Sequence, residues 1–185
     1  MGGEQTSARA TFVAMFRRGT TEASQARVDG MIARARELFI RAAEKHALAL
    51  EWDEDAPVEL AANIPKQTGL DWSLWLSLQN NDEIGIQHEF FWVEWFPADS
   101  PDREAEFARA LDGLLSGTVR LVCKFGSRGR RPYAVSLEEE TDSGWRQVSG
   151  YARGVHLGTA KGIMILRNGH VPFLEGRAVE VSLPG

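Results

Sequence analysis

Two stretches of the chain place apolar residues at three- and four-residue spacing, the pattern of an amphipathic helix. The first predicts a helix at about 21–49, with an apolar stripe made of Val28, Met31, Ile32, Ala35, Leu38, Phe39 and Ala42. The second predicts a helix at 101–116. It begins after the cap residue Ser100, has Pro101 at its first position and ends at Gly117.

Between and after these helices the period changes to two, which is typical of half-buried strands. Trp72, Leu74, Leu76 and Leu78 share one face of a strand, and Asn80-Asn81-Asp82 follows as a turn. A long returning strand is predicted from Ile84 to Phe96. Further strands are predicted at 58–64, 119–125, 133–138, 145–151, 163–166, 170–174 and 178–183, with Asn168-Gly169 as a two-residue hairpin turn.

This order predicts one α+β domain over residues 1–185. We expect a single antiparallel sheet with both helices on one face, in the order helix, strands, helix, strands. Short connections disfavour a parallel sheet. Residues 1–9 are expected to be disordered, and residues 155–185 to form a C-terminal hairpin appendage.

Composition narrows the class of protein. The 185 residues carry a formal net charge of −5, a mild acidic excess that disfavours nucleic acid as a partner. Cys123 is the only cysteine, so neither an internal disulfide nor a structural zinc site is expected. No apolar run is long enough for a membrane helix. We therefore expect a soluble, cytoplasmic protein without a cofactor or metal, and its preference for arginine over lysine suggests a bacterial source.

One hypothesis places a ligand pocket between the first helix and the sheet. On a continuous strand, His88, Trp92 and Glu94 share the face of Ile86, and a buried charge there needs a partner. His46 extends the apolar stripe of the first helix towards the same layer. The competing interpretation is that each is a satisfied core or rim residue. A shared metal ion is disfavoured, because six strand residues separate His88 from Glu94 by about 20 Å.

A second hypothesis concerns an aromatic surface. Trp75, Phe91 and Trp95 fall on the face opposite the leucines. If no second layer covers them, they form an exposed aromatic patch of the kind that marks protein interfaces. The alternative is that the C-terminal segment folds over this face.

The third candidate is a basic loop with Arg128, Arg130 and Arg131. Such a loop can contact RNA or phosphate. The rest of the chain is acidic and carries no accompanying RNA-binding motif, so a solvated hairpin tip is the favoured interpretation.

No catalytic motif accompanies these features, so the sequence favours a non-catalytic protein-interaction or self-associating module. Its partner would be another protein or a second copy in a homodimer, and not a membrane. The order of elements resembles that of small acidic secretion-chaperone-like folds, and a toxin-neutralising immunity protein would have similar gross features. The alternative function is a small-ligand pocket protein or enzyme that uses the polar cluster of His46, His88 and Glu94.

Overall fold

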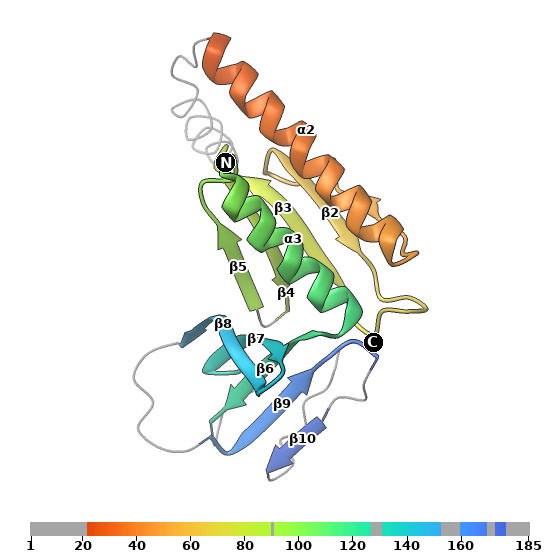
Figure 1. Cartoon of the computed structure of the whole chain (residues 1–185), viewed down its shortest axis with the longest axis vertical. Helices are drawn as coiled ribbons and strands as arrows, with labels where there is room; N and C mark the ends of the chain where they lie inside the picture. Colours follow the sequence, from red (N-terminus) through yellow and green to blue (C-terminus); the bar gives the residue numbers. More distant parts are fainter. Residues whose placement is uncertain (1–21, 90, 127–130, 153–159, 170–172, 177–185) are drawn as a thin grey trace, which may run out of the picture.

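The computed structural model describes residues 22–89, 91–126, 131–152, 160–169 and 173–176 (Figure 1). The elements are, in chain order, α2 (Glu22–Lys45), β1 (Glu51–Trp52), β2 (Leu60–Ile64), β3 (Leu74–Gln79), β4 (Glu83–His88), β5 (Phe91–Trp95), α3 (Pro101–Ser116), β6 (Val119–Phe125), β7 (Ala134–Thr141), β8 (Gly144–Ala152), β9 (Gly162–Leu166) and β10 (Phe173–Gly176). The predicted α+β class, with antiparallel strands, is confirmed. The expectations for residues 1–9 and 178–183 lie outside the described residues.

The strands form two sheets, whereas the sequence pattern predicts one. The first is a meander in the order β1-β2-β3-β4-β5, and the second has the order β10-β9-β6-β7-β8. Figure 1 shows α2 and α3 on the same side of the first sheet, and the second sheet beyond the C-terminal end of α3. The two helices therefore cover one face of the first sheet, as predicted, while α3 also connects that sheet to the second.

The end of α2 differs from the prediction by one turn. The helix stops at Lys45, and Ala47 adopts a left-handed conformation with φ of 54°. The Leu48 amide then donates to the Ala43 carbonyl at 2.9 Å, which is the six-to-one bond of a Schellman cap. This cap occupies helix carbonyls that would otherwise lack a partner. His46 therefore lies in the turn after the helix and not on its apolar stripe.

The predicted strand from Ile84 to Phe96 is interrupted at Glu89. A turn at Glu89 separates β4 from β5, and His88 pairs directly with Phe91. Residues paired directly across two strands lie on the same face of a sheet. The turn therefore reverses the face of every β5 side chain relative to a continuous strand, because side chains alternate with a period of two.

The reversal places the odd-numbered residues of β5 against the helices. Val93 pairs with Ile86, and Trp95 pairs with Ile84, on the face of the buried leucines. Trp95 packs edge-on against Phe107 of α3, with ring centroids 5.4 Å apart and planes at 85°. Phe107 also contacts Phe39 of α2 at 5.8 Å. These aromatic contacts join both helices to the first sheet in one hydrophobic core.

The second sheet contains the C-terminal strands as an integral part. β9 pairs with β6 on one side and β10 on the other, so it is an inner strand and not an appendage. The apolar faces of β6, β7 and β9 continue the same core through Leu121, Val135 and Met164. The predicted boundary at residue 155 therefore does not separate an independent part of the fold.

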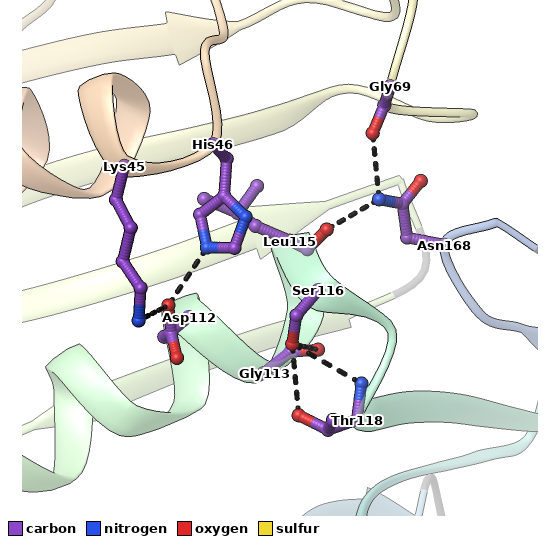
Figure 2. A network of polar contacts seen from close by, with 9 residues as sticks. All are labelled: Lys45, His46, Gly69, Asp112, Gly113, Leu115, Ser116, Thr118 and Asn168. Carbon is purple, nitrogen blue, oxygen red and sulfur yellow. Dashed lines mark hydrogen bonds and ion pairs between the residues drawn. The ribbon is translucent and has the colours of Figure 1, made fainter.

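The turn between β9 and β10 is longer than the predicted two-residue hairpin, because pairing starts only at Ile165 with Phe173. Asn168 in this connection points its side chain into the molecule (Figure 2). Its Nδ2 donates to the carbonyls of Gly69 at 2.8 Å and Leu115 at 2.5 Å, and its Oδ1 accepts from the Asp71 amide at 3.1 Å. One side chain thus joins the second sheet, the loop before β3 and the end of α3.

Close packing where α3 meets β6 depends on two glycines. A methyl group at Gly113 would lie 2.3 Å from Cγ2 of Val119. Gly117 ends the helix in the left-handed conformation, with φ of 80°, and a Cβ there would lie 2.5 Å from the Asn168 carbonyl oxygen. Glycine at both positions lets the helix approach the second sheet.

No described helix is long and apolar enough to cross a membrane.

Candidate functional site

The structure does not bring the four predicted pocket residues together. His46 lies in the turn after α2, where its Nε2 donates to Oδ1 of Asp112 on α3 at 2.8 Å (Figure 2). Lys45 Nζ contacts the same oxygen at 2.7 Å. The Lys45 ammonium, followed by the His46 hydrogen bond, holds the pKa of Asp112 below its ordinary value against the opposing effect of burial. This cluster joins the two helices, which supports the structural interpretation of His46.

The Asp112 contacts predict a defined pH dependence of stability. A carboxyl group whose folded-state pKa is lowered stabilises the fold above its unfolded pKa of about 3.9, and this contribution is lost as pH falls through the folded-state value. We expect Asp112→Asn to lower the free energy of unfolding above about pH 5, by at most about 1 kcal/mol because the group is partly exposed, with the difference shrinking towards pH 3. Urea denaturation between these pH values measures it. A difference that stays constant with pH would contradict the assignment.

His88 and Glu94 lie on opposite faces of the first sheet. His88 donates from Nδ1 to the Ser73 carbonyl at 2.9 Å and packs edge-on against Trp72 at 5.1 Å. Burial lowers its pKa, with the Ser73 bond acting in the opposite direction. Glu94 and Trp92 are on the outer face, because they pair with Gly85 and Gln87. His88 and Glu94 therefore do not share a face as expected, because the turn at Glu89 reverses the face of every β5 side chain.

The predicted aromatic surface is divided by the same turn. Phe91 and Trp95 are buried, with exposed fractions of 2% and 9%, so they belong to the core. Trp75 is on the outer face, half-buried. The exposed aromatic residues near this sheet are instead Trp92, at 55%, and Phe96, at 59%.

Of the predicted basic loop, Arg128 and Arg130 lie outside the described residues. Arg131 is described and its side chain is exposed. The thiol of Cys123 is buried, and burial raises its pKa to about 12, which disfavours the thiolate form needed by a nucleophile. Across the parts of the chain that the structure describes, no three or more His, Cys, Asp or Glu residues are grouped to hold a metal ion.

A different feature of the molecule has the form of a binding site. A cleft of about 550 Å³ lies between β5, α3 and β8, and we call it the edge cleft. Its walls are residues 93–95 of β5, one flank of α3, Val119, residues 137 and 139 of β7, and residues 146–149 of β8. No β4 residue lines it, so it lies on the side of β5 away from β4. Its volume is within the range of ligand pockets in proteins.

Two strands at the sheet edges border the cleft. β5 ends the first sheet and β8 ends the second, and within the described part of the chain neither pairs with another strand on its outer side. Alternate residues of an edge strand direct backbone N–H and C=O groups away from the sheet, where they can pair with an added strand. Among the described residues, the outward backbone groups of both strands therefore have no partner strand at the border of the edge cleft.

A β-bulge shapes the β8 wall. Leu137 pairs with Ser149 and Glu138 pairs with Gln147, so Val148 is an extra residue without a partner on β7. Val148 lines the cleft and has an exposed fraction of 46%. Bulges redirect side chains and are frequent beside functional sites.

Arginine and glutamate side chains supply the charges of the cleft. Arg103 pairs with Glu106 at 2.7 Å, and Arg146 pairs with Glu139 at 2.8 Å. Arg109 also lines the cleft, and no hydrogen bond or ion pair connects it to another described residue.

Glu94 is the third carboxylate of the edge cleft, and it is hydrogen-bonded by the Gln79 side-chain amide. Burial raises its pKa, and the neighbouring Glu83 raises it further. Each cleft carboxylate therefore has a hydrogen-bonding partner on the protein, whereas one guanidinium has none among the described residues.

Sequence reasoning missed Arg109 and Val148. The three-residue spacing of Arg103, Glu106 and Arg109 places them on one flank of the second helix, and this signal was present in the sequence. The flank becomes a cleft wall only through the position of β8, which no local pattern predicts.

Comparison of the chain with protein-family models, with curated proteins and with solved structures found no match.

Proposed function

We propose that this protein is a non-catalytic interaction module that binds an extended segment of a partner protein along the free edge of β5. One observation carries the proposal: the edge cleft lies beside β5, whose outer side is unpaired within the described chain. Adding a strand to such an edge is a common mode of peptide recognition, in which backbone hydrogen bonds provide affinity and side-chain pockets provide specificity.

The aromatic residues at this edge support the same function. Trp92 is on the outer face of β5, and Phe96 follows the strand directly. Side chains of an added strand would lie beside Trp92, because neighbouring strands place their side chains about 5 Å apart. Large exposed aromatic residues are the usual anchors of protein interfaces. They add apolar contact area to that of the cleft wall.

The alternative of an enzyme built on the predicted polar cluster has less support. His46 contacts Asp112, His88 lies on the inner face of the first sheet, and Glu94 lies on its outer face. A general acid or base must reach the reacting atom within hydrogen-bonding distance. Groups on opposite faces of one sheet do not meet that requirement together.

A defined peptide probe tests the proposal. The probe is a fluorescein-labelled hexapeptide that alternates valine and threonine, with a glycine–serine linker for solubility. We expect saturable binding by fluorescence anisotropy and slower hydrogen exchange of amides in residues 91–95. A matched peptide with prolines at alternate positions lacks the N–H donors of a strand, so it should not bind.

Protein variants separate this site from other surfaces. Trp92→Ala should weaken peptide binding by about tenfold, the loss expected for an interface aromatic residue. Ile40→Ala, at an exposed apolar position on α2, should leave it unchanged. Equal binding of the proline peptide, or protection confined to other strands, would contradict the proposal. Concentration-dependent dimerisation that protects β5 would assign the edge to a second copy of the chain and not to a partner peptide.

A further inference from the structure

We infer that the partner segment is acidic and that Arg109 binds one of its carboxylates inside the edge cleft. This inference rests on the proposed function, because it names the chemistry of the segment that β5 would bind. It concerns a residue on α3, whereas the proposed function concerns the backbone edge and Trp92. The two ideas can therefore fail separately.

The distribution of charge in the cleft is the first argument. Glu106 forms an ion pair with Arg103, and Glu139 forms one with Arg146. Glu94 accepts a hydrogen bond from the side-chain amide of Gln79. Arg109 has no such partner in the described chain. A segment that brings a carboxylate matches this unpaired guanidinium, which has a planar array of donors suited to carboxylate binding. A segment that brings a cation would be repelled by Arg109, whose positive charge has no anionic partner among the described residues.

The position of Arg109 is the second argument. It lies on the flank of α3 that lines the cleft, one turn after Glu106 and beside Ala110. α3 covers the inner face of the first sheet, as Figure 1 shows. Side chains of an added strand alternate between the two faces, so every second one points towards the α3 side. An acidic residue at such a position would approach Arg109, while its neighbours would face Trp92.

Arg109 is exposed in the free protein, and a segment bound in the cleft would partly shield its ion pair from water. Trp95, Ala110 and the bulged Val148 form apolar parts of the cleft wall. An ion pair between fully exposed groups contributes little, but one that an interface partly desolvates is stronger and more specific. The preference for an acidic segment should therefore be measurable and should decrease at high salt, which screens the remaining exposed charge.

Three peptides of equal length test the inference. Each alternates valine with a second residue, which is glutamate, threonine or lysine. We expect the glutamate peptide to bind about fivefold tighter than the threonine peptide at low salt, and the lysine peptide to bind most weakly. Arg109→Ala should reduce the glutamate preference to about twofold or less, and Arg109→Glu should reverse the order of the glutamate and lysine peptides.

A control arginine distinguishes local pairing from a change in overall charge. Arg41→Ala removes an exposed arginine that pairs with Glu37 on α2, outside the cleft, and should leave the glutamate preference unchanged. Binding of all three peptides with equal affinity, unaffected by Arg109, would overturn the inference and leave strand addition standing. A preference for the lysine peptide would also overturn it. Failure of all three peptides to bind would reject the proposed function and this inference together.

Discussion

Replacing Trp95 with alanine is expected to lower the free energy of unfolding by about 3–5 kcal/mol, the usual cost of removing a large buried aromatic side chain. Trp95 is buried between β5 and α3, where its indole packs edge-on against Phe107. Alanine would leave a cavity in the core that joins the first sheet to both helices. Urea denaturation followed by far-ultraviolet circular dichroism measures the loss.

Trp92→Ala is the matched control for this measurement, because it removes the same side chain three residues earlier on the same strand. Trp92 is mostly exposed on the outer face, so its replacement should cost about 1 kcal/mol or less. A continuous strand from Ile84 to Phe96 would predict the opposite result, with Trp92 in the core. Similar losses for both variants, or a larger loss for Trp92, would contradict the turn at Glu89 and the face assignment.

Asn168→Ala should destabilise the protein by about 3 kcal/mol, because it removes three hydrogen bonds and leaves buried backbone groups unpaired. The carbonyl of Leu115 is among the last of α3, where no intrahelical donor is available. The Gly69 carbonyl and the Asp71 amide lose their partner as well. The free energy of unfolding, measured by the same denaturation assay, gives the loss.

Two further variants make the Asn168 measurement specific. Asn168→Asp keeps the size and one acceptor but removes both N–H donors and places a carboxylate beside two carbonyls, so it should be at least as destabilising as alanine. Asn63→Ala changes a half-buried asparagine of β2 with no described side-chain hydrogen bond, and should cost less than about 1 kcal/mol. If Asn168→Ala lowers the free energy of unfolding no more than Asn63→Ala does, the Asn168 side chain does not hold the second sheet to the first sheet and α3.

Local patterns predicted the elements well where one physical signal dominates. The helix at Pro101–Ser116 has a proline at its start, a regular apolar stripe and glycine at its end, and all three agree with the structure. β6 follows clear period-two alternation and β9 is a short apolar run, and the predicted spans of both agree with the structure to within a residue. The α+β class follows from such elements, since it depends on their type and order.

The division into two sheets was not predictable from alternation, which reports only that one face of a strand is buried. It does not report which strand lies beside it, and the pairing of β9 with β6 across the β7–β8 hairpin has no local signature. The turn at Glu89 also has no signal in the sequence, because Glu89 and its neighbours include none of the glycine, asparagine or proline residues that usually mark a turn.

The same turn explains why the sequence pattern places the β5 side chains on the wrong faces. An error of one position in a period-two element moves each side chain to the other face. A continuous strand places Trp92 and Glu94 on the inner face of the sheet and Phe91 and Trp95 on its outer face, which is the reverse of the observed faces. The edge cleft itself combines an edge of each sheet, so it exists only once both sheets are assembled.

The strand order also has a consequence for how the chain folds. Every pairing in the first sheet joins consecutive strands, so that sheet depends on contacts that are close in sequence. The second sheet closes only when β9 reaches β6 past the intervening hairpin, which is a contact of larger sequence separation. Because loop-closure entropy opposes such contacts, they limit folding rates. We therefore expect docking of β9, together with insertion of the Asn168 side chain, to be a late step in folding.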